Sequence, residues 1–400
     1  MTPLWTIDEI LAATGGRLAG DPGPIGGASI DTRTLAPGDL FFAIRGEARD
    51  GHDFVRDALG KGAAASVVAE DRAAEFTETG PLVVVPDVLG AMGDLGRAAR
   101  RRVRAGIVAV TGSVGKTGTK EALRHVLSRQ GRTHASVASY NNQWGVPLTL
   151  ARMPRDSEFG VFEIGMNHAG EIAPLTAMVA PHVAIVTTVE PVHIEYFRSV
   201  LGIADAKGEI FSGLVPGGTA VLPRDNPHFE RLRAHAAASP AGRVLTFGES
   251  EAADVRALRI AVEADRSEVE ARVLGRPLAF RVGTPGRHVA LNALALLSAG
   301  AALGIDLDAA GRALADLKPP PGRGERTWLS LAGGRALLVD ESYNANPASV
   351  RAALATLGAT EPAGGRRIAV LGDMLELGPE GPVLHRDLAE PVSARSRWRT

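Results

Sequence analysis

The chain has 400 residues, a formal net charge of −1 and 45% hydrophobic residues, enough for packed cores in about two or three domains. It has no cysteine, which excludes disulfides, thiolate metal sites and a cysteine nucleophile. No basic block with interleaved aromatic residues indicates nucleic-acid binding, no secretory signal opens the chain, and no apolar run is long enough to cross a membrane. We therefore expect a cytoplasmic protein that neither binds nucleic acid nor inserts into membranes. A monomer is also expected, but the sequence does not give the oligomeric state.

The first stretch, residues 1–86, is typical of a small α/β domain. Thr6 is placed as the N-cap of a helix over residues 6–11, with Glu9 as its capping-box partner. Short apolar runs predict strands over residues 40–44, 64–68 and 82–85.

Four polar residues lie in loops beside the first of these strands: Asp31, Thr32, Arg33 and Arg45. They are either solvated loop charges or an anion site, because an arginine beside hydroxyl groups suits a phosphate. The sequence alone leaves both interpretations open.

Residues 106–129 read GIVAVTGSVGKTGTKEALRHVLSR and predict a strand, a glycine loop and an amphipathic helix. Gly112 and Gly115 allow backbone N–H groups to turn toward phosphate oxygens, and the helix N-terminus adds partial positive charge. Lys116 can reach the phosphates of a nucleotide, and the Thr117 hydroxyl can ligate Mg²⁺. The loop is shorter than the general G-x-x-x-x-G-K-[ST] pattern and alone could be a glycine turn; its setting favours nucleotide binding.

A helix over residues 88–103 leads into a second domain in which strands alternate with helices, so a mostly parallel sheet is expected. Ligands of such sheets lie beyond the carboxyl ends of the strands. Glu163 lies near the end of a strand predicted over residues 159–164, and His193 comes just beyond Thr187 and Thr188 at the end of another. Glu163 is either a carboxylate for Mg²⁺ or a paired acid, and His193 is either a site residue or a structural histidine.

Four further stretches complete the middle of the chain. Asn141 and Asn142 form either a simple turn or two amides that face a ligand. A helix over residues 199–214 contains Lys207, and a helical lysine is usually solvated. Residues 243–282 predict short antiparallel strands, and a helix over residues 289–303 contains Asn292 in its first turns.

The sequence PPPGRG, residues 319–324, indicates a linker into a third α/β domain. A strand over residues 336–339 ends at Asp340, a helix begins at Ser349, and another strand is predicted over residues 368–371.

These motifs together resemble the Mur ligase family. They run in the family's order from near Ser29 to Gly378: DTRTLAPGDLFFAIRGEARDGHDF, TGSVGKTGTKE, NNQWGVPLTL, EIGMNHAGEI, HIEYF with ADAKGEIF, GRHVALNAL, PPPGRGER, DESYNANPASV and VLGDMLELG. The resemblance implies an α/β fold of three domains. These are a UDP-substrate domain (residues 1–86), a central P-loop domain with a parallel sheet that binds ATP (87–317) and an incomplete Rossmann-like ligase domain (318–400).

The resemblance also implies the roles of individual residues. ATP is expected to contact Gly112, Ser113, Val114, Gly115, Lys116, Thr117 and Gly118 through its phosphates, Asn292 through adenine, Asp340 through ribose and Arg323 through the γ-phosphate. The implied Mg²⁺ ligands are Thr117, Glu163 and His193, and the implied catalytic residues are Lys116, His193 and Lys207, the last as a carbamate. The implied substrate contacts are Asp31, Thr32, Arg33, Asn141, Asn344 and Asn346.

The implied reaction is ATP-dependent addition of D-alanyl-D-alanine to a UDP-N-acetylmuramoyl-tripeptide through an acyl phosphate, in peptidoglycan precursor synthesis. The third residue of the tripeptide is left open between lysine and diaminopimelate. The alternatives are a Mur ligase that adds a single amino acid, a folylpolyglutamate synthase, and a homologue that binds nucleotide without turnover. The segments YNANP and NN favour the D-alanyl-D-alanine ligase over the other ligases of the family.

Two departures from the family pattern carry expectations. Gly118 replaces a residue that often bears a hydroxyl, which should cost only helix stability. Family members continue beyond GDMLELG, whereas this sequence ends in EPVSARSRWRT, which has no apolar period. The expectation is a third domain that lacks part of its sheet, and a weakly active or inactive chain.

Overall fold

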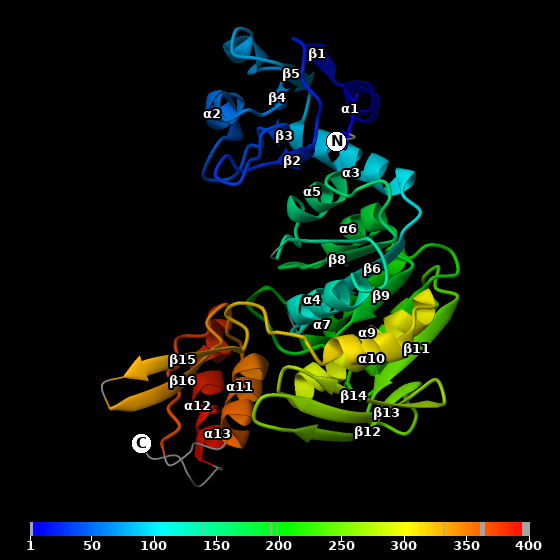
Figure 1. Cartoon of the computed structure of the whole chain (residues 1–400), viewed down its shortest axis with the longest axis vertical. Helices are drawn as coiled ribbons and strands as arrows, with labels where there is room; N and C mark the ends of the chain where they lie inside the picture. Colours follow the sequence, from blue (N-terminus) through cyan, green and yellow to red (C-terminus); the bar gives the residue numbers. More distant parts are fainter. Residues whose placement is uncertain are drawn as a thin grey trace. The chain divides into compact units, whose positions relative to one another are not determined.

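The computed structural model describes residues 3–137, 139–192, 194–197, 199–331, 333–360 and 365–393. The chain divides into two compact units, residues 1–105 with 134–160, and residues 106–133 with 161–400 (Figure 1). Each unit is built around its own sheet.

The first unit has a five-stranded sheet in the order β1-β5-β4-β3-β2. Strands β2 to β5 are parallel, and β1 runs antiparallel to β5. The elements of this unit are α1 (Ile7–Thr14), β1 (Arg17–Ala19), β2 (Gly27–Ser29), β3 (Asp39–Phe42), η1 (Gly51–Phe54), α2 (Val55–Gly60), β4 (Ala65–Ala69), η2 (Ala73–Phe76), β5 (Leu82–Val85), α3 (Val88–Arg102) and α5 (Gly145–Ala151).

Local sequence explains these elements. The Thr6 side chain accepts from the Glu9 backbone N–H at 3.3 Å, and the Glu9 carboxylate accepts from the Thr6 N–H at 3.1 Å, so the predicted capping box is confirmed. Strands β3, β4 and β5 are buried along their whole length, as expected for a parallel sheet covered on both faces.

A nine-stranded sheet in the order β14-β13-β12-β11-β10-β9-β6-β8-β7 belongs mostly to the second unit. Strands β6, β9, β10 and β11 pair in parallel, whereas β12, β13 and β14 form an antiparallel meander. The strands are β6 (Gly106–Thr111), β7 (Thr133–Ala135), β8 (Phe159–Glu163), β9 (Val183–Val186), β10 (Thr219–Pro223), β11 (Arg243–Gly248), β12 (Val255–Val262), β13 (Ser267–Val273) and β14 (Arg276–Val282).

Helices cover this sheet and bring the candidate site residues to its edge. Helix α9 contacts β9 to β13 and α4, and α10 packs on both α4 and β14 (Figure 1). These elements are α4 (Lys116–Leu127), α6 (Ile172–Val179), η3 (Ile194–Tyr196), α7 (Val200–Gly208), η4 (Glu209–Gly213), α8 (Phe229–Ala237), α9 (Arg287–Leu303) and α10 (Leu307–Leu314).

The C-terminal part of this unit holds an antiparallel hairpin and four short or medium helical segments. They are β15 (Glu325–Leu331), β16 (Gly334–Asp340), α11 (Pro347–Ala359), η5 (Gly378–Glu380), α12 (Gly381–Arg386) and α13 (Ala389–Ser393). The strand predicted over residues 368–371 is wrong. That segment has no regular structure, and Val370 is 92% exposed. No strand of the described residues pairs with it, so its apolar sequence lacks the partner that a strand requires.

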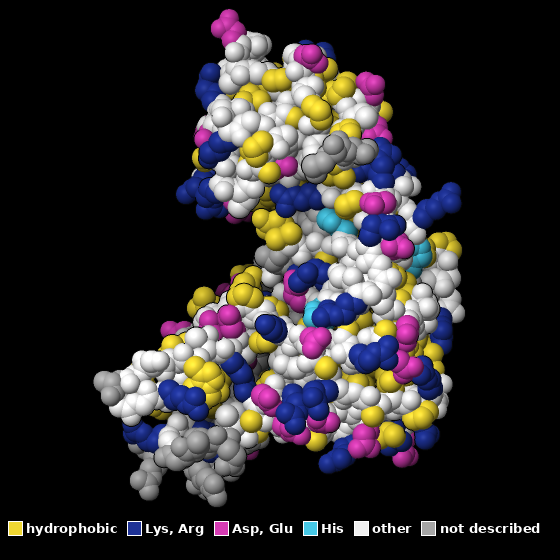
Figure 2. Space-filling view, in the orientation of Figure 1, with side chains coloured by type: hydrophobic (Ala, Val, Ile, Leu, Met, Phe, Trp, Pro, Cys, Tyr) yellow, Lys and Arg dark blue, Asp and Glu magenta, His cyan; other side chains and the backbone are white. Residues whose placement is uncertain are grey.

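The surface carries interspersed charges of both signs over the face shown in Figure 2. Among the described residues, no helix is both long and apolar enough to span a bilayer.

Candidate functional site

The phosphate loop connects β6 to α4 and depends on two glycines. Gly112 has φ +149° and Gly115 has φ +88°, a region that side-chain-bearing residues rarely adopt. A Cβ atom on Gly112 would collide with the Thr187 hydroxyl, and one on Gly115 would lie 2.7 Å from Nδ2 of Asn292. The backbone therefore approaches its neighbours so closely that only glycine fits.

The segment that follows β9 holds this loop in shape. The Thr187 hydroxyl donates to the Val114 carbonyl at 2.6 Å, and the Ser113 N–H donates to the Thr188 carbonyl at 2.9 Å. The Ser113 hydroxyl donates to the Glu190 carbonyl at 3.0 Å and accepts from the Glu190 N–H at 2.9 Å. The loop is thus fixed by hydrogen bonds before any nucleotide arrives, which lowers the entropy cost of binding.

Lys116 opens α4, and its side chain folds back over the loop. Its Nζ donates to the Gly112 carbonyl at 2.8 Å. Burial lowers the pKa of Lys116; Arg323 lowers it further, while Glu163 opposes both. Thr117 beside it is 6% exposed.

Glu163 and Lys207 are each 1% exposed and lie near Lys116. Burial lowers the pKa of Lys207 far below its ordinary value, and Lys116 adds to the shift, which places the two amines within electrostatic reach of each other. The interpretation of Lys207 as a solvated helical lysine is therefore wrong. The structure brings Lys116, Glu163 and Lys207 into one cluster, whereas His193 lies outside the described residues.

The Glu209 carboxylate binds the N-terminus of helix α6. Glu209 accepts from the Gly170 N–H at 2.7 Å and from the N–H groups of Ile172 and Ala173 at 3.2 and 3.1 Å. It therefore caps the N-terminus of α6 while its charge partly offsets the low pKa of Lys207.

A cavity of about 450 Å³ adjoins the phosphate loop. It is lined by predicted contacts and by residues that the sequence did not single out. The predicted ones are Val114, Gly115, Gly118, Asn292, Arg323 and Asn344. The new ones include Glu121, Asn226, His288, Glu341 and Ser349.

Two of these additional residues lie at sequence positions that could have identified them as candidate site residues. His288 belongs to the GRH segment that opens α9, and desolvation by the surrounding protein lowers its pKa, although the residue is exposed. Glu341 follows Asp340 at the end of β16. Desolvation by the surrounding protein raises the pKa of Glu341 to about 7, against the opposing effect of Arg323. The residue is nevertheless exposed.

Asp340 and Asn346 have local structural partners and are absent from the cavity lining. The Asp340 carboxylate accepts from the Ser342 N–H at 2.9 Å. The Asn346 side chain accepts from the Ser349 N–H at 2.9 Å and caps α11. Their ligand contacts therefore stay predictions.

In the first unit, Asp31 and Arg33 form an ion pair with 2.6 Å between Oδ2 and the guanidinium. The hydrogen bonds from Arg33 lower the pKa of Asp31 to about 2. Thr32 is 9% exposed, and its carbonyl accepts from Nζ of Lys61 at 3.1 Å.

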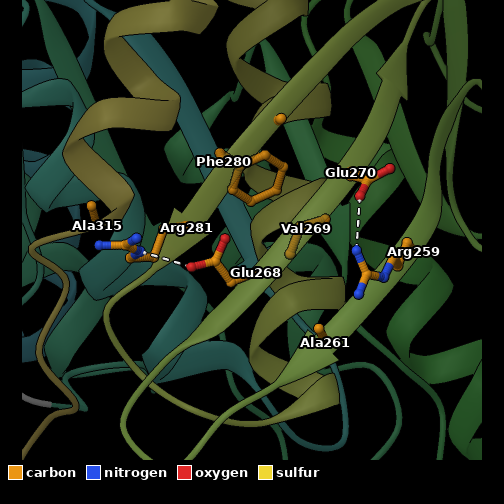
Figure 3. Close-up of a pocket in the computed structure, with 9 residues that line it drawn as sticks. Arg259, Ala261, Glu268, Val269, Glu270, Phe280, Arg281 and Ala315 are labelled. Atoms are coloured by element: carbon orange, nitrogen blue, oxygen red, sulfur yellow. Dashed lines mark hydrogen bonds and ion pairs between the residues drawn. The ribbon is translucent and has the colours of Figure 1, made fainter.

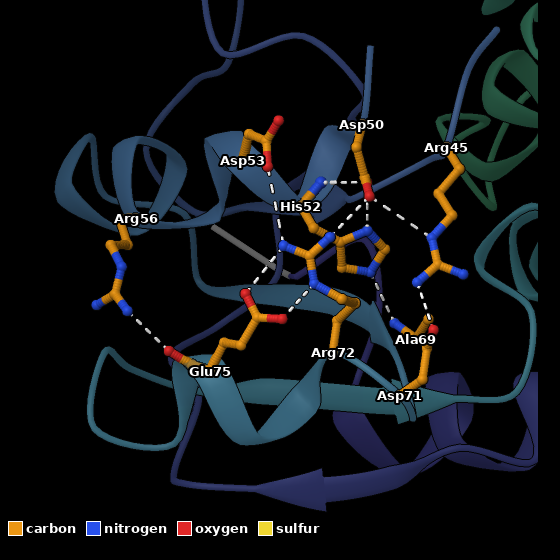
Figure 4. A network of polar contacts seen from close by, with 9 residues as sticks. All are labelled: Arg45, Asp50, His52, Asp53, Arg56, Ala69, Asp71, Arg72 and Glu75. Atoms are coloured by element: carbon orange, nitrogen blue, oxygen red, sulfur yellow. Dashed lines mark hydrogen bonds and ion pairs between the residues drawn. The ribbon is translucent and has the colours of Figure 1, made fainter.

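A charged network lies around Asp50 in the same unit (Figure 4). His52 is buried, and its Nε2 accepts from the Ala69 N–H at 3.0 Å, so Nδ1 carries the proton and donates to Asp50 at 2.6 Å. Arg72 donates to the other Asp50 oxygen at 2.8 Å, and Arg45 also pairs with Asp50 at 3.6 Å. Sequence reasoning noted only Arg45, because nothing in the pattern showed which acids it would meet.

The Asn142 side chain accepts from the N–H groups of Trp144 and Gly145 at 3.2 and 3.0 Å, at the start of α5. This supports the turn interpretation for Asn142, while the substrate contact of Asn141 remains a prediction.

A second hollow, about 350 Å³, lies over β12 to β14 and contains no predicted site residue (Figure 3). Its charges pair with one another, Arg259 with Glu270 and Arg281 with Glu268, each at 3.2 Å. Because these charged side chains pair with one another, the hollow is a weaker candidate for a ligand site than the cavity beside the phosphate loop.

Comparison with known proteins agrees with these features. The Mur ligase middle domain matches residues 110–300, the Mur ligase glutamate ligase domain residues 322–398, and the Mur ligase family catalytic domain residues 24–100. The chain is 36% identical over 390 residues to the UDP-N-acetylmuramoyl-tripeptide–D-alanyl-D-alanine ligase of Escherichia coli, covering 97% of this chain and 83% of that protein. The corresponding ligase of Bacillus subtilis is 32% identical over 369 residues, 92% of this chain and 78% of the relative.

Solved structures show the same similarity. MurF from Acinetobacter baumannii superposes with a TM-score of 0.86 at 30% identity, covering 97% of this chain and 83% of that one. MurF ligase from Thermotoga maritima, solved in complex with ADP, gives a TM-score of 0.76 at 28% identity, covering 92% and 82%. With its phosphate loop, its buried Lys207 and relatives of this identity and coverage, the chain belongs to the Mur ligase family.

Proposed function

We propose that the chain is an ATP-dependent ligase that joins D-alanyl-D-alanine to a UDP-N-acetylmuramoyl-tripeptide. The observation that carries this proposal is the phosphate loop, whose half-buried Lys116 lies near the buried Glu163 carboxylate and the buried Lys207. That cluster suits the activation of a carboxylate by phosphoryl transfer. The identity of the two substrates comes from the names of the relatives.

The backbone N–H groups of residues 112–117 hold the phosphates, and Lys116 moves from the Gly112 carbonyl to the β- and γ-phosphate oxygens. Arg323, in the cavity lining and stacked on Tyr343 at 4.2 Å, supplies a second positive charge at the γ-phosphate. Asn292 contacts adenine, and Asp340 contacts the ribose.

The donor set at the loop fits Mg²⁺. The Thr117 hydroxyl and the Glu163 carboxylate are hard oxygen ligands, and Mg²⁺ is commonly held by one or two carboxylates together with substrate phosphates. The described residues contain no group of three or more acids and histidines that could hold a metal alone, in keeping with a site completed by the nucleotide. When bound, Mg²⁺ supplies charge neutralisation at the phosphates; His193 is a further ligand in this proposal.

Lys207 has the environment that carbamylation needs. Burial and the neighbouring Lys116 favour the neutral amine, and the neutral amine is the form that adds to CO₂. The carbamate gives the cluster a second anion, which offsets the charge of Lys116.

The reaction proceeds in two transfers. The terminal carboxylate of the tripeptide attacks the γ-phosphorus, ADP leaves, and an acyl phosphate forms. The deprotonated amine of D-alanyl-D-alanine then attacks the acyl carbon, and the tetrahedral intermediate collapses to the amide and inorganic phosphate. Lys116 and Arg323 neutralise charge that develops on the transferred group, and the hydrogen-bonded loop keeps it in position.

In the first unit, Asp31, Thr32 and Arg33 hold the UDP end of the substrate, and Asn141, Asn344 and Asn346 make further contacts. Arg33 is well suited to this because its side chain is 83% exposed and its planar charge matches a diphosphate. The enzyme works in the cytoplasm as a monomer with domains 1–86, 87–317 and 318–400; light scattering tests the monomer.

The direct test incubates the full chain with ATP, Mg²⁺, the UDP-linked tripeptide and D-alanyl-D-alanine and measures phosphate release. Dipeptide-dependent release with formation of the UDP-pentapeptide supports the proposal. Release with a single amino acid on a UDP-linked dipeptide supports the sibling ligase instead. ATP binding without release in either mixture indicates a nucleotide-binding homologue and contradicts the proposal.

A further inference from the structure

The outer side of helix α7 is tied to helix α8 by an acid that the proposed reaction does not use. Asp205 lies on α7, two residues before Lys207, and its side chain is 37% exposed. Successive residues of a helix are rotated by about 100°, so a spacing of two residues places side chains on nearly opposite sides. Asp205 therefore faces away from the buried amine of Lys207 and toward α8.

Two residues of α8 hold the Asp205 carboxylate with three hydrogen bonds. Nε and Nη2 of Arg231 donate to Oδ1 and Oδ2 at 2.6 and 2.9 Å. Nε2 of His235 lies 2.8 Å from Oδ1 and is the donor, because an ionised carboxylate can only accept. The hydrogen bonds from Arg231 and His235 lower the pKa of Asp205 to about 2, against desolvation. Paired donation from a planar guanidinium fixes the direction of the contact as well as its length.

A glycine lets the two helices approach closely at the same place. Gly208 is three residues after Asp205, so both lie on the face of α7 that meets α8. A Cβ atom on Gly208 would lie 2.5 Å from Cγ and 2.9 Å from Cβ of His235. Because these atoms are at the root of the His235 side chain, a larger residue at position 208 would push the helices apart. The φ of Gly208 is −61°, which alanine also adopts, so the effect of alanine would come from this contact alone.

The other neighbour of Lys207 binds in a different direction. Glu209, two residues after Lys207, accepts from the backbone at the start of α6, so Lys207 lies between an attachment to α8 and an attachment to α6. The charges that shift the pKa of Lys207 are those of Lys116 and Glu209, in addition to burial. An effect of Asp205 on this amine therefore runs through the position of α7.

We propose that Asp205 is a positioning residue for the ligase reaction: by tying α7 to Arg231 and His235, it sets the place of the Lys207 amine relative to Lys116. The inference rests on the proposed function and adds to it the contact that holds this amine in the cluster. An exposed ion pair adds little to stability, whereas a displacement of about 1 Å in an active site can lower the rate about a hundredfold. Loss of the contact should therefore affect turnover more than folding.

The test measures phosphate release, ATP affinity by calorimetry and melting temperature for the full chain and for Asp205→Asn. We expect kcat to fall about tenfold or more, with ATP affinity and melting temperature near those of the wild type. Trace labelling with acetic anhydride, quantified by mass spectrometry against the exposed Lys61, reports on the Lys207 amine without turnover, and the variant should label Lys207 faster. Glu230→Gln removes an acid of α8 that pairs with Arg233 at 2.7 Å; it is the matched control and should keep the wild-type values.

Gly208→Ala disturbs the same contact from the other side, by pushing the helices apart. It should lower kcat as Asp205→Asn does, and His235→Ala in the same chain should restore turnover, because it makes room for the added methyl group. If Asp205→Asn keeps wild-type turnover, or loses turnover while the labelling of Lys207 stays unchanged, the inference is overturned. If the wild type releases no phosphate, the proposed function fails, and the labelling of Lys207 in Asp205→Asn then decides by itself whether Asp205 positions the amine.

Discussion

The phosphate loop offers a sharp test because two glycines of the same unit have nearly the same positive φ but differ in their surroundings. Gly115 has φ +88° and Gly275, in the turn between β13 and β14, has φ +86°. A Cβ on Gly115 would lie 2.7 Å from Nδ2 of Asn292, whereas a Cβ on Gly275 meets nothing within 4 Å. Alanine at either position adopts a left-handed conformation that costs about 1–2 kcal/mol.

Gly275→Ala should therefore reduce the free energy of unfolding by that backbone cost and leave ATP affinity unchanged. Gly115→Ala should cost more, because the Asn292 amide must move as well, and this displacement distorts the loop that holds the phosphates. We expect ATP affinity to fall at least about tenfold, or ~1.4 kcal/mol.

Urea unfolding followed by circular dichroism gives the stability of each variant, and calorimetry gives the affinity for ATP. Adding Asn292→Ala to Gly115→Ala should recover stability, because it removes the colliding amide. The reasoning is refuted if Gly115→Ala binds ATP as the wild type does, or if the two single variants lose equal stability.

Three further predictions concern the charged residues of the phosphate-loop cavity and of the first unit. Lys116→Ala should abolish detectable ATP binding with little loss of stability, because desolvation disfavours the ammonium group of Lys116; unchanged affinity in calorimetry would contradict the phosphate-loop assignment. Arg33→Ala should raise the pKa of Asp31 from about 2 toward its ordinary value, as followed by NMR titration of the carboxyl carbon; the stability from this pair is present above the ordinary carboxyl pKa and is lost as pH falls toward 2. Glu341 has a pKa of about 7, so its negative charge disappears as pH falls below that value, and ATP binding should strengthen; Glu341→Gln should flatten this pH profile, and an unchanged profile would exclude Glu341 as its source.

Local signals in the sequence predicted the elements that carry the site. The N-cap at Thr6, the glycine loop before Lys116 and the apolar runs of β6 and β8 each act over a few residues, so they can be read without knowing the fold. The rule that ligands lie beyond the carboxyl ends of parallel strands then brought Glu163 and Thr187 toward the loop.

Contacts between segments that are distant in the sequence could not be predicted from local signals. The pairing of Lys120 with Glu121 looks like an ordinary charged helix face, and only the packing of α9 and α10 on α4 reveals that it is buried. The segment 368–371 failed for the opposite reason: its composition favours a strand, but a strand also needs a neighbour, and the described residues provide none.

Burial gives Lys207 a property that a solvated lysine lacks, because it lowers the pKa and favours the neutral amine. Two ammonium groups within electrostatic reach in a buried site cannot both retain their protons at low cost. Burial and Lys116 lower the pKa of Lys207 against the opposing effect of Glu209, and burial lowers the pKa of Lys116 against the opposing effect of Glu163. We propose that Lys116 is the cation that faces phosphate and that Lys207 is the neutral amine. If that amine is carbamylated, mass spectrometry after trapping and ¹³C-bicarbonate NMR should detect the adduct, and Lys207→Met should remove the NMR signal while ATP binding persists. A signal that survives in Lys207→Met would assign the adduct to another amine and separate the low pKa of Lys207 from any role in the reaction.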